Sequence, residues 1–185
     1  MESLEGRLLI ALPPLNDGPF DRAVVLMIEH SEDGAMGLVL NEPTDTTIAE
    51  AVPEWADLAA DPPVVFLGGP VDRSIVFGLG RSSGQPTDGW QPFGTGIEHL
   101  GVVDLSRDPV LVGVDVETVR LFIGYAGWSP GQLEAEIDED AWLVVDAEPH
   151  DPFVADPGAL WRDVTRRQPG PERFLTTYPS DPASN

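Results

Sequence analysis

Gly-Tyr-Ala-Gly-Trp-Ser-Pro-Gly-Gln-Leu-Glu-Ala-Glu-Ile, at residues 124–137, is the most informative run of this protein. An apolar segment enters it, glycines alternate with two aromatic residues, and a helix start follows at once. Ser129 is placed to accept hydrogen bonds from the first helical turn, Pro130 suits the first helical position, and Gln132 can reach back. The leucine and isoleucine of the run then share one helix face. The run therefore predicts a strand-to-helix junction, and it contains no obvious reactive group.

Length and composition predict one compact domain with many strands and turns. The protein has 185 residues, of which 42% are hydrophobic, enough for a substantial core. Its 19 glycines and 19 prolines indicate a strand-rich fold rather than a helical bundle. No apolar stretch approaches the roughly 20 residues that span a bilayer. The N-terminus is acidic, unlike a secretory signal. We therefore expect a cytoplasmic protein that makes no membrane contact.

The charge of the protein argues against nucleic acid as a direct partner. Ten arginines and no lysine face 32 acidic residues, which gives a formal net charge of −22. Such a surface repels the phosphate backbone, so we expect no direct DNA binding and no adhesion to anionic membranes. The absence of cysteine excludes disulfides, thiolate metal sites and cysteine nucleophiles. The absence of lysine excludes Schiff-base and Walker-type phosphate chemistry.

Hydrophobic patterning predicts a series of strands. The nearly continuous apolar run at 23–29 predicts a strand that is covered on both faces. The polar connection at 31–34 contains Asp-Gly and predicts a hairpin with the next apolar run. The segment at 80–96 is rich in turn residues, lacks periodicity and predicts a loop. The strands are expected at residues 7–12, 23–29, 35–40, 63–67, 74–78, 98–103, 110–114, 118–124 and 142–145.

Helix signals are fewer. Thr47 followed by Glu50 resembles a capping box, so a helix is expected to start there and to run towards residue 58, with Pro53 limiting or bending it. A second helix is expected after Ser129.

The C-terminal part of the sequence predicts a further helix from 156 to about 167. A short helical turn at 172–177 and a frayed tail at 180–185 are expected beyond it. Hairpin-like strands with inserted helices predict a single α+β domain over residues 1–185. Its sheet is expected to be mainly antiparallel and partly barrel-like, with about three to four helices.

Glu29 and His30 end the second predicted strand and form the first chemical candidate. A carboxylate beside an imidazole could do acid–base work. Neighbours on a strand point to opposite faces, however, so we favour a hydrogen bond from one residue and a solvated position for the other. His99 and His150 have no metal-like spacing to His30, and no metal site is predicted.

Two further candidates follow strand ends. Asn41 is expected to hold a turn through its side chain, although it could also offer its amide to a ligand. Gly68, Gly69 and Pro70 occupy the place of a phosphate loop, but they match no nucleotide-binding pattern. A positive φ angle or a close backbone crossing is the favoured explanation. The carboxylates at 138–140 lack the spacing of a calcium loop and are expected in a solvated turn.

Short distinctive segments follow one another across nearly the whole sequence, at 6–13, 29–30, 34–41, 68–71, 124–137, 142–143 and 161. Together, and in this order, they resemble the YqgE/AlgH family of small bacterial proteins. The resemblance implies a single α+β domain with a mixed, partly barrel-like sheet and no established activity. One branch of the family carries the label of a transcriptional regulator of alginate synthesis, which need not involve DNA contact.

Three functional hypotheses remain open. The leading one is a non-enzymatic cytoplasmic regulator or interaction module, without cofactor, that binds a protein or small ligand. The second is an enzyme or cofactor binder that uses Glu29 or His30 as an acid or base. The third is a DNA-binding regulator, which the net charge disfavours. The candidate binding residues are Glu29, His30, Asn41, Gly68, Gly69, Pro70, Tyr125, Trp128 and Gln132.

Overall fold

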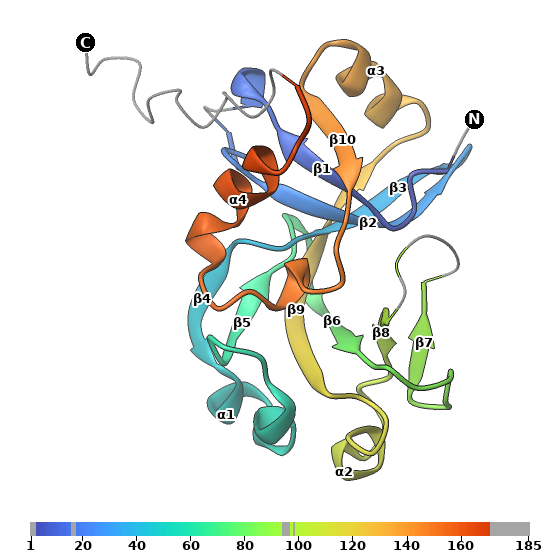
Figure 1. Cartoon of the computed structure of the whole chain (residues 1–185), viewed down its shortest axis with the longest axis vertical. Coiled ribbons are helices and arrows are strands. Elements are labelled where there is room, and N and C mark those ends of the chain that lie inside the picture. Colours follow the sequence, from blue (N-terminus) through green and yellow to red (C-terminus); the bar gives the residue numbers. More distant parts are fainter. Residues whose placement is uncertain (1–2, 16–17, 94–96, 98, 171–185) are drawn as a thin grey trace.

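Strand β9 (Thr118–Trp128) runs through the middle of the molecule and joins its two halves (Figure 1). Its last residues pair with β3 (Gly34–Val39), and its earlier residues pair with β5 (Val64–Leu67) and β6 (Val71–Arg81). The predicted strand ended at residue 124, so the prediction missed the glycine-containing end of β9. The structure is a computed structural model, and it describes residues 3–15, 18–93, 97 and 99–170.

The first half of the sheet is antiparallel. Its order is β10 (Trp142–Asp146), β1 (Arg7–Ala11), β2 (Val24–Ser31), β3 and then β9. Leu26 and Met27 are neighbours on β2 and belong to two different core clusters, which confirms that this strand is covered on both faces. The predicted hairpin of β2 and β3 is also confirmed.

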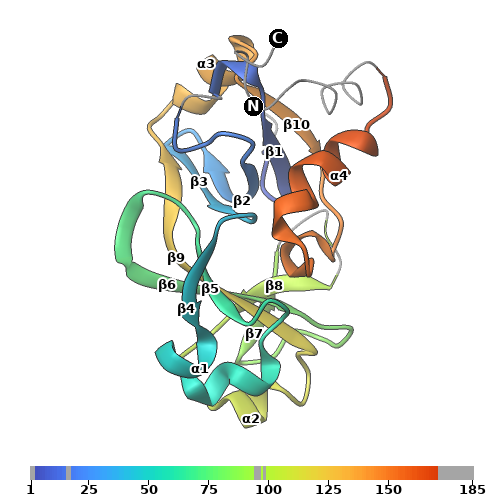
Figure 2. The ribbon, with the colours of Figure 1, turned by 90° about the vertical axis from the view of Figure 1, so that its left-hand side faces the viewer.

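The second half of the sheet contains five further strands. β6 lies between β9 and β8 (Leu100–Val103), and β8 pairs with β7 (Trp90–Pro92). β4 (Pro43–Thr47) pairs with β5, which in turn runs parallel to β9. The whole sheet curls into a half-barrel (Figures 1 and 2). The loop predicted at 80–96 is wrong in part, because β6 extends to its start and β7 lies within it.

The described part of the chain contains four short α-helices, which lie between or after the strands. The capping box is confirmed: the Thr47 side chain accepts from the Glu50 amide and Glu50 binds back. Helix α1 (Ile48–Ala51) nevertheless stops early, and a 3-10 helix at Pro53–Leu58 replaces the rest of the predicted helix. Helix α3 (Gln132–Asp138) lies at the end of the 124–137 run, where a helix was predicted.

Helix α4 (Leu160–Arg166) follows a 3-10 turn at Pro157–Ala159, as the C-terminal helix signal predicted. The Trp161 indole donates to the carbonyl of Ala11 at 3.0 Å, which fastens the helix to β1. Two more 3-10 turns lie at Pro13–Leu15 and Asp151–Phe153. The predicted turn at 172–177 and the tail at 180–185 lie outside the described residues.

The predicted strand at 110–114 is wrong. Helix α2 (Pro109–Val112) occupies this position, because the Asp108 side chain accepts from the amide of Val110 and Pro109 occupies the first helical turn. These start signals override the strand preference of the β-branched residues that follow. Only Val112 is buried, whereas the other large apolar side chains near the helix, Val110, Leu111 and Val114, are exposed.

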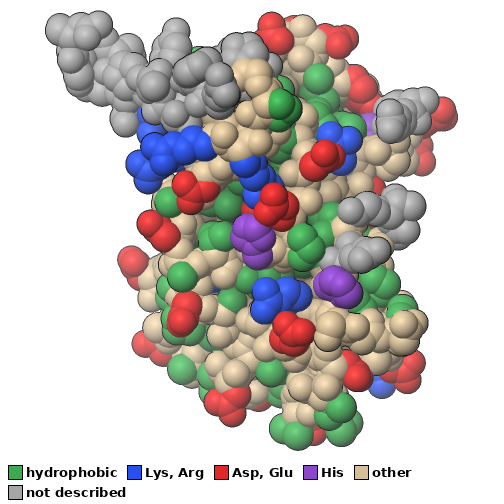
Figure 3. Space-filling model, in the orientation of Figure 1, with side chains coloured by type: hydrophobic (Ala, Val, Ile, Leu, Met, Phe, Trp, Pro, Cys, Tyr) green, Lys and Arg blue, Asp and Glu red, His purple; other side chains and the backbone are tan. Residues whose placement is uncertain are grey.

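Acidic side chains are scattered over the face of the molecule seen in Figure 3. Basic side chains gather beside α4 on the same face, where Arg162 and Arg166 are exposed. No helix in the described part of the protein is both long and apolar enough to cross a membrane.

Candidate binding site

At the strand-to-helix junction, one of the two predicted capping hydrogen bonds forms and the other does not. The Gln132 side chain accepts from the amide of Ser129 at 3.0 Å, as expected. The Ser129 side chain does not cap the helix, because Gly131, with φ of 75°, stands at the N-cap position. Gln132 also donates to Glu136 at 2.9 Å. The amide of this candidate residue is therefore engaged within the protein.

Contacts within the protein hold Trp128 in place. Its indole N–H and that of Trp142 donate to the same carboxylate oxygen of Glu136, at 2.9 and 2.8 Å. The two rings meet edge to face, with 5.9 Å between their centroids. Phe20 stacks on Trp128 at 6.5 Å. Trp128 is 7% exposed, so a small part of the ring faces solvent.

Glu29 and His30 do not form an acid–base pair. The His30 side chain is 2% exposed, its Nδ1 accepts from the amide of Leu4 at 3.1 Å, and its Nε2 lies 3.0 Å from Glu134. Since Nδ1 accepts, Nε2 carries the proton toward the carboxylate. Hydrogen bonds from its own backbone amide and then from His30 lower the pKa of Glu134. His30 therefore ties the N-terminal segment to α3, while Glu29 is exposed.

Asn41 joins two strands rather than closing a local turn. Its side-chain oxygen accepts from the amide of Val24, and its side-chain nitrogen donates to the carbonyl of Arg22, both at 2.9 Å. The amide thus fixes the start of β2 against the end of β3. Glu29 lies near the opposite end of β2, so the structure does not bring Asn41 together with the predicted acid–base residues.

The turn at Gly68–Gly69–Pro70 is a close backbone crossing. A Cβ atom on Gly69 would lie 2.1 Å from the carbonyl carbon of Tyr125, and the φ angle of Gly69 is +154°. A Cβ atom on Gly68 would lie 2.4 Å from the carbonyl oxygen of Gly124. The favoured sequence interpretation of these glycines is therefore confirmed. This crossing brings the turn directly against the start of the 124–137 run.

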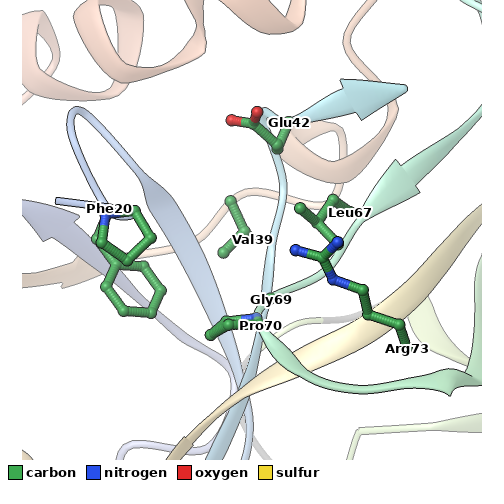
Figure 4. A pocket seen from close by; sticks show the side chains of 8 residues that line it. Phe20, Val39, Glu42, Leu67, Gly69, Pro70 and Arg73 are labelled. Atoms are coloured by element: carbon green, nitrogen blue, oxygen red, sulfur yellow. The ribbon is translucent and has the colours of Figure 1, made fainter. Parts of the chain in front are cut away.

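One apolar crevice, the β3–β5 crevice, opens beside this crossing. Its volume is about 180 Å³. Figure 4 shows Phe20 on one side and Arg73 on the other, with Pro70 below and Glu42 above. The crevice is lined by Pro19, Phe20, Val39, Glu42, Leu67, Gly69, Pro70 and Arg73.

Arg73 reaches the β3–β5 crevice from an exposed arm. β6 pairs with β9 at Val71 and again at Val76, and the four residues between them loop out (Figure 2). The Asp72 carboxylate accepts from the amide and hydroxyl of Ser74, which shapes this arm. Within the described residues, neither Arg73 nor Glu42 forms an ion pair. Both charges at the crevice are therefore available to a ligand.

A second, shallower recess, the β3–β9 hollow, has a volume of about 270 Å³. It brings together three candidates, Glu29, Tyr125 and Trp128, from β2 and β9. The Tyr125 ring packs edge to face on Phe77, and its hydroxyl has no hydrogen-bond partner within the described residues. The lining of the hollow consists of Glu29, Ser31, Asp33, Gly34, Ala35, Met36, Tyr125 and Trp128.

The candidate binding residues of the glycine turn and of the 124–137 run are thus divided between two recesses. Gly69 and Pro70 line the crevice, whereas Tyr125 and Trp128 line the hollow. Asn41 and Gln132 line neither recess, because their amides are used internally. The residues that give the crevice its chemistry were not predicted from the sequence, because only the tertiary fold brings them together from separate segments. They are Phe20, Glu42, Leu67 and Arg73.

The described residues place no group of three His, Asp or Glu side chains where they could share a metal ion. The sequence also contains no cysteine.

The AlgH-like family profile, DUF179, matches residues 8–173. The chain belongs to the AlgH-like family. A UPF0301 protein of Streptomyces coelicolor is 46% identical over 187 residues, which cover 100% of this chain and 97% of the relative. A UPF0301 protein of Thermobifida fusca is 42% identical over 194 residues, covering 99% and 96% of the two proteins.

Two solved structures share the AlgH-like fold. The crystal structure of a Corynebacterium diphtheriae protein superposes with a TM-score of 0.85 at 34% identity, covering 96% of this chain and 94% of that one. The solution structure of the AlgH protein from Pseudomonas aeruginosa gives a TM-score of 0.70 at 31% identity, with coverage of 96% and 95%. The family resemblance and the α+β fold class predicted from the sequence are thereby confirmed.

Proposed function

We propose that this AlgH-like protein is a non-enzymatic cytoplasmic binding module that takes up a protein segment or a small ligand in the β3–β5 crevice. The crevice itself carries the proposal: its apolar walls are flanked by two charges of opposite sign, and neither forms an ion pair with a described residue. Recesses of this composition bind ligands through apolar contact, and their few polar groups fix the orientation.

The size of the crevice limits what it accepts. Its volume of about 180 Å³ is below the roughly 300–1,000 Å³ of sites for drug-sized ligands and cofactors. A single apolar side chain or a molecule of similar size fits this space. A dinucleotide does not.

The alternative of an enzyme that uses Glu29 and His30 has less support. The ring nitrogens of His30 are engaged with Leu4 and Glu134, and Glu29 belongs to a different recess from the β3–β5 crevice. Direct DNA binding stays disfavoured by the net charge of −22.

The test is a small-molecule screen by amide NMR on the isotope-labelled protein, with Leu67→Trp as the blocking variant. We expect ligands that shift amides around the crevice in the native protein and lose this effect in the variant, whose indole fills the space. Arg162→Gln on α4 is the matched control and keeps ligand binding. The proposal fails if hits map elsewhere, or if correctly folded Leu67→Trp binds them equally well.

A further inference from the structure

The geometry points to a free apolar α-amino acid, bound as its zwitterion, as the ligand of the β3–β5 crevice. This inference rests on the proposed function and specifies its ligand. It follows from three chemical features of the same crevice: an apolar wall, a guanidinium and a carboxylate, the last two without an ion-pair partner among the described residues.

The apolar wall suits an aliphatic or aromatic side chain. Phe20 and Val39 supply it together with Leu67 and Pro70, which come from one segment, the end of β5 and the turn after it. Burial of an apolar group against such a wall is the main source of affinity for a small ligand.

Arg73 supplies the contact for the α-carboxylate. Its guanidinium points into the recess from the exposed arm (Figure 4). Guanidinium and carboxylate groups match in a planar, two-hydrogen-bond geometry, so Arg73 would fix the direction of the ligand. Four other arginines of the described residues already have carboxylate partners, namely Arg7, Arg81, Arg107 and Arg167.

Glu42 supplies the contact for the α-ammonium group. It stands across the crevice from Pro70 and forms no ion pair with a described residue (Figure 4). The carboxyl terminus of a peptide would offer a carboxylate to Arg73 but no cation to Glu42. The amino terminus of a peptide would leave Arg73 unmatched, and an internal peptide segment carries neither main-chain charge. A zwitterion offers an oppositely charged partner to each of the two side chains.

The charge of the whole molecule favours a ligand without net charge. A protein of net charge −22 repels anions over long distances, so a simple carboxylic acid or an acidic peptide is disfavoured before it reaches Arg73. A zwitterionic amino acid approaches without this penalty and still presents a carboxylate at short range.

The test is titration of the full-length protein with L-leucine, followed by amide NMR and calorimetry, beside leucine amide and N-acetyl-leucine. Leucine amide lacks the carboxylate, and N-acetyl-leucine lacks the ammonium. We expect leucine to bind at the crevice and each blocked analogue to bind at least tenfold more weakly. We also expect Arg73→Gln and Glu42→Gln each to weaken leucine binding about tenfold, while Arg162→Gln and Glu54→Gln have no effect.

The pairing of variant and analogue identifies each contact. Leucine amide binds wild type and Arg73→Gln equally, because the partner of Arg73 is already absent, and N-acetyl-leucine likewise does not distinguish Glu42→Gln from wild type. The inference is overturned if N-acetyl-leucine binds as tightly as leucine, which would indicate recognition of the carboxylate alone. It is also overturned if leucine, valine, methionine and phenylalanine all fail to bind.

Failure of the two proposals can be told apart. One outcome is that the amino acids fail to bind while other small molecules bind and are excluded by Leu67→Trp. In that case the binding function of the crevice stands, and the inference that its ligand is a zwitterionic amino acid is wrong. If nothing binds at the crevice, both proposals are wrong.

Discussion

At the residue scale, the fold depends on positions where a side chain is sterically impossible. Gly69 lets the turn after β5 touch the backbone of Tyr125, and the same glycine lines the β3–β5 crevice. The residue contributes no functional group. Its part in the proposed site is to allow two backbones to approach within a distance that no other residue permits.

We predict that Gly69→Ala lowers the free energy of unfolding by about 3 kcal/mol or more, because the new methyl group clashes with β9 and the φ angle is strained. Gly131→Ala is the matched control: its φ angle is also positive, at +75°, but nothing lies within 4 Å of the new Cβ atom. The control should lose only about 1–2 kcal/mol. Urea denaturation measures both values, and equal losses would show that the close crossing is not decisive.

At the element scale, local start signals determine the short helices. Asp108 and Pro109 start α2 in a segment whose β-branched residues favour a strand. Helix α2 then buries one side chain and exposes its neighbours.

We expect Val112→Ala to cost about 1–3 kcal/mol of stability, because Val112 is 4% exposed and packs in the core below α2. Val110→Ala, at a position that is 77% exposed, should change stability by less than about 0.5 kcal/mol. Thermal and urea denaturation of the two variants give the comparison. Similar effects at both positions would contradict the helical placement, because on a strand residues 110 and 112 would lie on the same face.

The capping box of α1 gives a prediction for pH. Hydrogen bonds from the Thr47 side chain and then from its backbone amide lower the pKa of Glu50 from its ordinary value of 4.5. A carboxylate whose pKa is lower in the folded state stabilises the fold above its unfolded pKa, and this contribution is lost as the pH falls through the folded pKa.

Wild type should therefore be more stable than Glu50→Gln at neutral pH, and the difference should shrink as the pH falls below about 4.5. Urea denaturation of both proteins, from neutral pH down through the carboxylate range, measures this difference. Glu54→Gln, outside the capping box, is the control. A difference that stays constant with pH would exclude the ionised carboxylate as its source.

At the scale of the whole molecule, Arg120 ties distant segments together. It is 2% exposed on β9 and donates to the carbonyl groups of Asp61, Pro62, Pro152 and Val154. Its guanidinium also lies 4.2 Å from the centroid of the Phe66 ring. Burial lowers the pKa of Arg120 to about 10, and the charge of Asp61 opposes this shift.

Arg120→Met should destabilise the protein by about 3 kcal/mol or more, because it removes charge-assisted hydrogen bonds and leaves buried carbonyl groups unpaired. Arg81→Met is the control, since the Arg81–Glu117 pair is partly exposed to solvent and should contribute at most about 1 kcal/mol. Chemical denaturation separates the two expectations. Equal effects would mean that the carbonyl contacts of Arg120 are replaced by water at little cost.

The net charge of −22 gives a prediction for the molecule as a whole. Repulsion among the carboxylates opposes the compact state, and salt screens it. The melting temperature should therefore rise by several degrees as sodium chloride is added near neutral pH. The same series near the isoelectric point of about 4.1 should show a smaller rise. A melting temperature that falls with salt at neutral pH would indicate that ion pairs such as Arg167–Asp151 outweigh the repulsion.

The sequence by itself determined most strands, the capping box of α1, the hairpin of β2 and β3, and the family. These features depend on periodicity and on residues a few positions apart, so local physics is sufficient for them. Tertiary structure alone decided that Asn41 bonds to the start of β2, that His30 bonds to Leu4 and Glu134, and that Arg73 faces Phe20 across a crevice. These contacts join residues far apart in the sequence, and a hydrogen bond or recess between them leaves no local pattern to read.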